Sequence, residues 1–311
     1  MKKIIVIIIA VYTGLSVWAQ QPVLLKFNPL QNKTYRLKTI STQNMSQSIQ
    51  GMQQNTTVTS STVLSMKMVE SGQDFLVMEF RFDTMLINTN AAGMNIDINS
   101  DKPGDLNSND IGEVLSVLMN RYCSNPLYAK MNFEGKVIEL INIKIFTDMM
   151  LKDIDSIKSQ FAQVIKSRAV MMADPGAIQS TIESVTAYLP GKEVEKGNSW
   201  DISLKTNSGG MMYLINSHYT LTGIKNNVAD VAFESTIEPA SSAPVKIDAA
   251  TITNNIRGTG KSAMTIDINS GFLIESTGKY HMEGDMGVQA QGMNMSIPTV
   301  INGETRIFSI Q

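Results

Sequence analysis

Apolar and polar residues alternate in two adjacent stretches of the chain, residues 57–69 and 76–83. A Glu-Ser-Gly-Gln turn separates the two stretches. A period of two is typical of an antiparallel sheet that buries one face. The pattern therefore predicts a β-hairpin, whose apolar face consists of Leu64, Met66, Met68, Leu76, Met78, Phe80 and Phe82.

The rest of the chain contains further β-type segments. Residues 127–132 and 136–141 predict a hairpin around a Phe-Glu-Gly turn. Residues 91–109 are rich in Gly, Asn and Asp, and they predict a loop with one short strand. Other predicted strands are residues 23–27, 33–49, 200–205, 211–223, 228–237, 262–268, 272–283 and 306–310, with a linker at 239–244.

Helical spacing appears near the middle of the chain. From residue 143 the apolar residues are three or four apart, which predicts an amphipathic helix of several turns. Asp174-Pro175 is a typical start for a second helix, and Asp110 with Glu113 resembles a capping box that opens a short third helix. The apolar face of the first helix consists of Phe146, Met150, Ile154, Ile157, Phe161 and Ile165.

The segment Leu189–Trp200 separates the helical region from the strands that follow it. Pro190 and Gly191 are expected to end the preceding helix, and Gly197 to supply the turn before a strand that begins at Trp200. Residues 32–37 resemble residues 198–202, and residues 131–139 resemble residues 267–275. These similarities favour a duplication, although turn chemistry also recurs in unrelated hairpins. In this arrangement Tyr35 and Trp200 are candidate equivalent aromatic anchors of the two sheets. The five structural candidates are Tyr35, Pro190, Gly197, Trp200 and Gly271.

These patterns predict an α+β protein that is mostly β. We expect curved antiparallel sheets, for which two related half-barrels are one arrangement, with a central helical pair and one short helix. The expected division is a signal peptide at 1–19, an N-terminal β-rich half at 20–142 with a short helix at 110–122, a helical segment at 143–189 and a C-terminal β-rich half at 190–311.

The first residues indicate export. Lys2 and Lys3 precede an apolar run that extends to Val17, and Ala19 offers a signal-peptidase cleavage site. The alternative is an uncleaved anchor, although the run is short and no positive charge follows it immediately. We therefore expect an exported mature protein, without a transmembrane segment after cleavage.

Composition limits the classes of partner. The chain has 26 basic and 28 acidic residues, so nothing favours binding to nucleic acid. Its single cysteine, Cys123, has no partner for an internal disulfide, which leaves a packed thiol or an intermolecular bridge. The 21 methionines suit an adaptable apolar pocket, or they fill an ordinary core.

Catalytic and metal-binding patterns are weak. The two histidines, His218 and His281, are expected on solvated strand faces, and no serine lies in a Gly-x-Ser-x-Gly motif. The acidic loop around residues 97–110 lacks the glycine and glutamate positions of a calcium-binding loop. A copper site is the alternative to ordinary strand alternation for five residues: His281, Met282, Met286, Met293 and Met295. We expect no enzyme, metal or cofactor.

The motifs Leu-Pro-Gly-Lys-Glu-Val at 189–194, Gly-Asn-Ser-Trp at 197–200 and Asp-x-x-x-Gly at 267–271 resemble those of an uncharacterised family of exported Gram-negative proteins. That family, a domain of unknown function, implies a location in the periplasm or cell envelope of a Gram-negative bacterium, and it implies no activity. The architecture more loosely resembles periplasmic lipoprotein carriers, in which a curved antiparallel sheet wraps helices around an apolar cavity. Thr84 and Ser156 lie in short sequences similar to an O-glycosylation signal, which also occur by chance.

The expected function is non-catalytic. We expect an exported envelope protein that binds an apolar ligand, a lipid or an acyl chain, in a methionine-lined concavity. The alternative is an envelope scaffold or protein-interaction module with no small ligand. The candidate ligand-binding residues are Met66, Met68, Met78, Phe80, Phe82, Met150 and Phe161.

Overall fold

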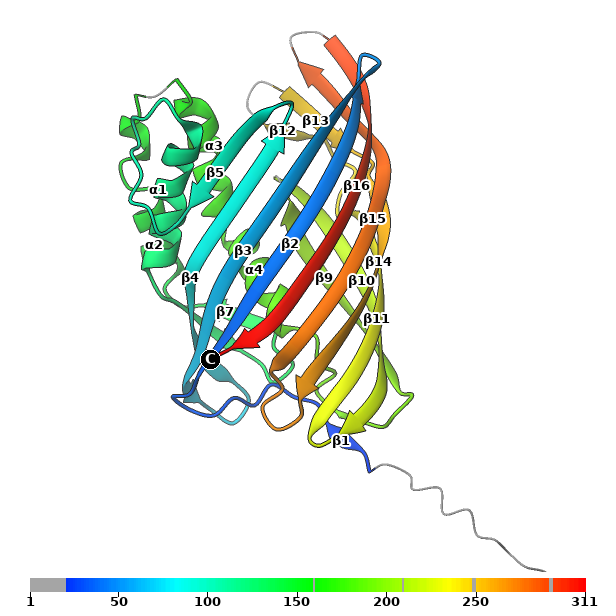
Figure 1. The fold of residues 1–311 in the computed structure, drawn as a ribbon. Coiled ribbons are helices and arrows are strands. Elements are labelled where there is room, and N and C mark those ends of the chain that lie inside the picture. Colours follow the sequence, from blue (N-terminus) through cyan, green and yellow to red (C-terminus); the bar gives the residue numbers. More distant parts are fainter. Residues whose placement is uncertain (1–20, 159, 209, 248–249, 291–292) are drawn as a thin grey trace, which may run out of the picture.

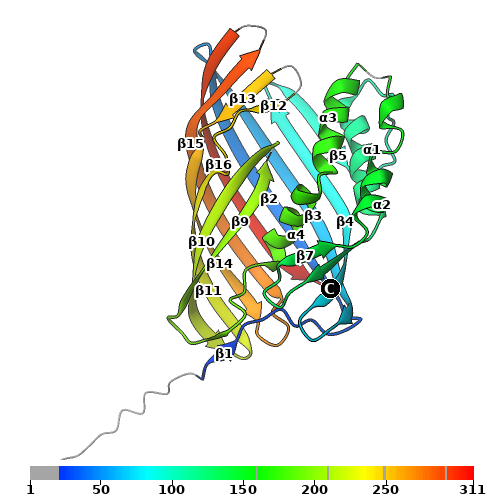
Figure 2. The ribbon, with the colours of Figure 1, turned by 180° about the vertical axis from the view of Figure 1, so that it is seen from behind.

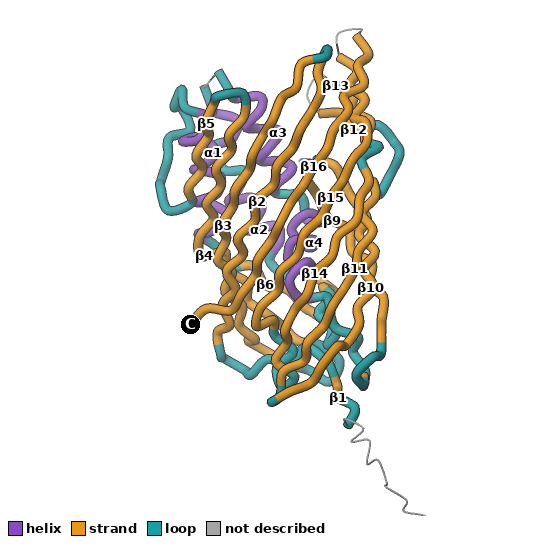
Figure 3. Tube along the Cα trace, turned by 45° about the vertical axis from the view of Figure 1, so that its right-hand side comes forward, coloured by secondary structure: helices purple, strands orange, loops and turns teal. Residues whose placement is uncertain are grey.

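A large, strongly curved antiparallel sheet forms most of the protein (Figures 1 and 3). The computed structural model describes residues 21–158, 160–208, 210–247, 250–290 and 293–311, so the expected signal peptide lies outside the described residues. In spatial order the main strands are β7 (Val137–Leu140), β6 (Leu127–Met131), β4 (Leu76–Ala91), β3 (Met52–Ser71), β2 (Thr34–Ile49), β16 (Met293–Ile310), β15 (Leu273–Ala290), β14 (Arg257–Asp267), β11 (Val228–Pro239), β10 (Met211–Lys225) and β9 (Ser199–Ser208).

Strands from both halves of the chain belong to this sheet, because β2 pairs with β16 along most of its length. Three short strands extend it: β5 (Met94–Asn99) pairs with β4, β13 (Ala250–Asn254) pairs with β15, and β12 (Val245–Ile247) pairs with β13. The prediction of a mostly β protein with curved antiparallel sheets is confirmed. Whether the two halves are a duplication stays a prediction.

The main sheet is open in the described part of the chain, with β7 and β9 at its two ends. The helices are α1 (Ile111–Ser124), α2 (Ile143–Met150), α3 (Ala162–Met172) and α4 (Pro175–Thr186), with a 3₁₀ turn η1 (Ile154–Ser156). Helix α4 packs against both β7 and β9 and thus lies between the two sheet ends (Figure 2). No helix in the described residues has the length and apolar character needed to cross a membrane.

Two helix starts follow the sequence prediction. The Asp110 carboxylate accepts a hydrogen bond from the Gly112 backbone N–H, and the Asp174 carboxylate accepts one from Ala177. The long helix predicted from residue 143 is wrong, because the chain breaks into α2, η1 and α3. Asp153 adopts a left-handed conformation with φ of 57° and Ile157 is extended. The apolar spacing records which side chains are buried, and the backbone between them need not remain helical.

Two strand predictions also need correction. Strand β16 begins at Met293, whereas the sequence predicted only residues 306–310 as a strand. Pro298 weakens a strand pattern because it has no N–H, yet it lies just before Thr299, where pairing with β2 begins. Proline is tolerated where a strand has a free edge. Strands β12 and β13 follow the predicted linker and were missed.

The two ends of the molecule differ. We call the base the end where residues 25–28 cross between other segments: Leu25 bonds to Lys192, Phe27 to Phe133 and Asn28 to Ser270 through backbone groups. Strand β1 (Val23–Leu24) pairs there with β8 (Glu193–Val194). We call the tip end the opposite end, which carries the turns at residues 50–51 and 92–93 (Figure 1).

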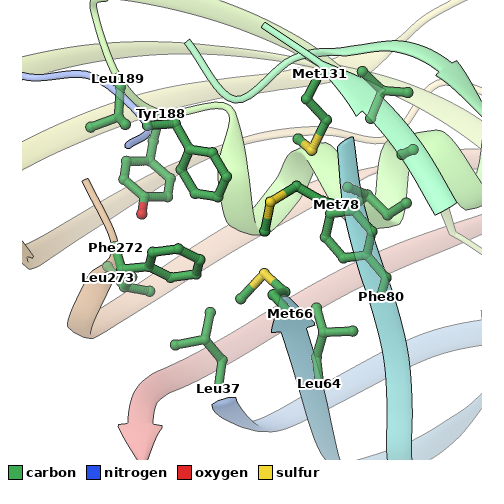
Figure 4. Packing of buried hydrophobic residues seen from close by; sticks show 14 of the residues in the cluster. Leu37, Leu64, Met66, Met78, Phe80, Met131, Tyr188, Leu189, Phe272 and Leu273 are labelled. Carbon is green, nitrogen blue, oxygen red and sulfur yellow. The ribbon is translucent and has the colours of Figure 1, made fainter. Parts of the chain in front are cut away.

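The outer face of the sheet is polar. Cross-strand ion pairs connect Lys261 with Glu234 at 2.8 Å and Arg306 with Glu275 at 2.8 Å. Such pairs are typical of a solvated strand face and contribute little to stability individually. The inner face at the base is apolar and packs into one continuous core (Figure 4).

Candidate functional site

Most of the predicted ligand-binding residues lie together in the core near the base. Met66, Met78 and Phe80 are fully buried, and their side chains converge with that of Met131 (Figure 4). Six of the seven predicted residues belong to this cluster: Met66, Met68, Met78, Phe80, Phe82 and Met150. These side chains therefore pack against neighbouring core residues. A ligand-binding role for them stays a prediction.

Phe161 is separate from the other six. It is half-buried against a second cluster, which contains Ile154, Ile157 and Ile165. This cluster joins η1 and α3 to α1. The break between α2 and α3 explains the separation, because a continuous helix would have kept Phe161 in line with Met150.

The two predicted aromatic anchors both stack on other rings. The Trp200 ring lies 5.6 Å from that of Tyr219 at an interplanar angle of 6°, and its Nε1–H donates to the Tyr188 carbonyl at 3.1 Å. The Tyr35 ring lies 3.9 Å from that of Phe272 at 2°. Tyr35 thus contacts the C-terminal half, whereas Trp200 contacts its neighbouring strand. The partners differ, and the equivalence of the two anchors stays a prediction.

The predicted turn residues lie at the base. Gly271 has φ of 71°, and a side chain there would collide with the Lys26 carbonyl. The Tyr188 hydroxyl donates to the Gly271 carbonyl at 2.8 Å. Gly197 has φ of 91° but faces open space. Pro190 is half-buried next to Gly191, while α4 already ends at Thr186, before the predicted stop.

A cavity of about 240 Å³ lies between the sheet and the helices. Its walls are formed by strand β4, helices α1, α3 and α4, the end of β9 at Asn207, and Gly210. Its lining is rich in methionine, and Phe82 is its one member from the predicted set. The lining residues are Phe82, Met85, Met119, Tyr122, Arg168, Met171, Met172, Ala177, Ile178, Thr181, Asn207 and Gly210.

The cavity also contains polar groups. Tyr122 is 6% exposed, and its hydroxyl has no hydrogen-bond partner among the described residues. Burial raises the pKa of this phenol, so the hydroxyl remains protonated and able to donate. The Asn207 side-chain oxygen accepts from the Gly210 backbone N–H at 2.9 Å, and Thr181 donates to the Ala177 carbonyl at 2.9 Å. Arg168 is exposed at the cavity and has no ion-pair partner in the described ranges.

Sequence reasoning missed the methionines of the cavity for identifiable reasons. The pairing of β3 with β4 shifts register between Val63 and Leu64, so Phe82 faces Leu64 and Thr84 faces Val63. After this bulge the Met85 side chain lies on the inner face, together with Phe82. Simple alternation would place Met85 and Phe82 on opposite faces of the sheet. Met171 and Met172 end α3, whose start the broken helical pattern concealed. The adjacent methionines before the Asp174 cap were the available signal.

The groups most suited to catalysis are distributed over the structure. His218 Nδ1 lies 2.7 Å from an Asp201 carboxylate oxygen on the exposed outer face, and His281 lies near Glu283. Cys123 is half-buried, and burial raises the pKa of its thiol. A raised thiol pKa disfavours the reactive thiolate at neutral pH. The searched part of the chain holds no group of three or more metal-ligating side chains of His, Cys, Asp or Glu.

Several solved structures are similar to this chain at low scores. The COG4313 outer membrane channel from Pseudomonas putida F1 shares 7% identity, covering 91% of this chain and 98% of that chain, with a TM-score of 0.29. Pseudomonas aeruginosa OccK2 (OpdF) in complex with glucuronate shares 5% identity, covering 91% and 100%, with a TM-score of 0.25. A DUF1329 family protein from Desulfovibrio piger ATCC 29098 shares 9% identity, covering 86% and 83%, with a TM-score of 0.13. These scores support no functional argument.

Sequence comparison gives one assignment. No curated protein matches the chain. The model of DUF6263, a family of unknown function, matches residues 73–273. This range extends from the β3–β4 turn through helices α1 to α4 to the start of β15. The match covers more than half of the chain, and the protein therefore belongs to the DUF6263 family.

Proposed function

We propose that this protein is an exported, non-catalytic envelope protein of a Gram-negative bacterium that binds an apolar ligand, a lipid or an acyl chain. The observation that carries the proposal is the methionine-lined cavity between β4, α1, α3 and α4. Methionine side chains are flexible and polarizable, so they adapt to chains of different shape. The cavity, at about 240 Å³, is smaller than the usual ligand pocket of roughly 300–1,000 Å³.

The position of the cavity supports reversible binding. Helices α3 and α4 form one wall, and Asn207 and Gly210 lie near the open end of the sheet at β9. The main packing partners of helix α3 are α1, α4 and η1. Displacement of α3 would thus open the cavity without breaking the pairing of the main strands. Export is supported by Lys2, Lys3 and the apolar run that follows them.

A binding experiment with a matched pair of variants tests the proposal. Nile red, a neutral apolar dye, is titrated into the mature protein, and fluorescence enhancement reports binding. Ala177 lines the cavity on α4, so Ala177→Leu fills it while keeping a good helix former. Ala232 is exposed on the outer face of β11, and Ala232→Leu is the control. We expect A177L to weaken dye binding at least tenfold and A232L to leave it unchanged.

Native mass spectrometry of protein taken from an envelope fraction tests the ligand class. We expect adducts with the mass of a lipid or fatty acid, and exchange with labelled lipid. Recovery of bare polypeptide, together with no dye binding by the wild-type protein, would refute the proposal. That result would favour the scaffold or protein-interaction alternative, which the close packing of six predicted ligand residues supports.

A further inference from the structure

The cavity is asymmetric in charge. Among the described residues, its lining includes one cationic side chain, Arg168, and no carboxylate. Arg168 lies on α3 and has no ion-pair partner in the described part of the chain. Elsewhere, Arg36, Arg81, Arg257 and Arg306 each pair with a carboxylate. An arginine that borders an apolar cavity and lacks such a partner has its donors available to an anion.

A second, buried group points to a ligand with hydrogen-bond acceptors. Tyr122, which is 6% exposed, lines the cavity, and its protonated hydroxyl has no hydrogen-bond partner among the described residues. The hydroxyl oxygen retains some accessible surface, so it can donate to a ligand or to water. The Asn207 side-chain nitrogen is a third donor without a described partner, because only its oxygen is engaged by Gly210.

We propose that the ligand is a single-chain amphiphile with an anionic head, a carboxylate or a phosphate, whose head is bound by Arg168 and whose chain enters the methionine-lined cavity. This inference rests on the proposed function and adds the charge of the ligand to it. The guanidinium presents a planar set of donors that matches carboxylate and phosphate oxygens. Because Arg168 is exposed, the head remains at the solvent boundary, and only the chain needs to leave water.

Competition against bound Nile red measures the preference. Decanoate, decanol and decyltrimethylammonium have chains of the same length and differ in the charge of their heads. We expect decanoate to displace the dye at about tenfold lower concentration than decanol, equivalent to ~1.4 kcal/mol. The cationic amphiphile should displace it least. Decyl phosphate, compared with decanoate, distinguishes the two kinds of anionic head.

Variants assign the preference to Arg168. Arg168→Gln should remove the advantage of decanoate and leave the affinity for decanol unchanged, whereas Arg168→Lys should retain part of it. Arg257 is an exposed arginine on the outer face, so Arg257→Gln serves as the control and should leave both affinities unchanged. Tyr122→Phe should weaken decanoate and decyl phosphate more than decanol.

The results of these experiments distinguish failure of the anionic-head inference from failure of the proposed apolar-ligand binding. Equal binding of decanoate and decanol to the wild-type protein overturns the anionic-head inference, while an apolar ligand remains supported. Equal loss of both ligands in R168Q also overturns it, since Arg168 would then act on the cavity as a whole. If no amphiphile displaces the dye and the dye itself does not bind, both proposals fail.

Discussion

The base and the tip end of the molecule use the same strands in different ways. Near the base, Leu37 of β2 and Leu64 of β3 are paired and 2% and 5% exposed. Further along the same two strands, the pair Gln43 and Val58 is only half-buried. The register is unchanged between the two pairs. The difference is that Leu37 and Leu64 belong to a large cluster of buried aromatic and aliphatic side chains at the base.

Methionine follows the same division. Met66, Met78 and Met131 are fully buried near the base, whereas Met52, Met94 and Met293 lie at hairpin ends of the tip end and are 64%, 65% and 56% exposed. The base is thus filled by its own side chains, as expected for a part that stabilises the fold. The methionine-lined cavity lies between β4 and helices α1, α3 and α4.

Removal of the Trp200 ring should give the largest loss of stability. The ring is 7% exposed, stacks on Tyr219 and bonds to the Tyr188 carbonyl. Truncation of a buried aromatic ring to alanine costs ~3–5 kcal/mol. We expect Trp200→Ala to lower the free energy of unfolding by that amount in urea denaturation. Trp200→Phe keeps a stacked ring and should cost clearly less; unchanged unfolding of the alanine variant would contradict the anchor role.

Two glycines distinguish the energetic cost of a positive φ from the cost of a steric clash. Gly271 and Gly197 both have positive φ, but only at Gly271 would an added methyl group meet another backbone, at Lys26. A non-glycine residue in such a conformation costs ~1–3 kcal/mol. We expect Gly271→Ala to exceed this conformational cost and Gly197→Ala to remain within it, both measured by thermal and chemical unfolding. Equal losses would show that the Lys26 contact is relieved by a small movement of the base.

The sequence predicted the base better than the site, for physical reasons. In the β3–β4 and β6–β7 hairpins, both the alternation and the turn lie within a short stretch of sequence. Such a stretch is enough to predict the hairpin. The cavity depends on a register shift opposite Val63 and on the break at Asp153. Both depend on how distant segments pack. Nothing in the alternation of residues 76–83 indicates that a bulge follows it. The sequence therefore could not predict which face of the sheet carries Met85.

Removal of the Tyr188 hydroxyl tests a single hydrogen bond at the base. It donates to the Gly271 carbonyl at 2.8 Å in a buried setting, while the ring also packs in the core. Loss of a partner from a buried acceptor costs ~1–3 kcal/mol. We expect Tyr188→Phe to fall at the lower end of this range, because the ring is retained. A circular dichroism melt that matches the wild type would show that the Gly271 carbonyl finds another donor.

A matched pair of valines gives the finest comparison of the two ends. Val231 faces the core from β11 and is 1% exposed, whereas Val58 is half-buried on the inner face of β3 toward the tip end. Threonine has nearly the same shape as valine, so each substitution changes polarity and little else. A buried hydroxyl without a partner costs ~1–3 kcal/mol in mutational data, whereas substitutions at accessible positions remain within ~0.5 kcal/mol. We expect Val231→Thr to destabilise by ~1 kcal/mol and Val58→Thr to have no measurable effect. Similar losses in urea denaturation would mean that the inner face near the tip is as dry as the base, and the space available to a ligand would then be confined to the cavity beneath α3.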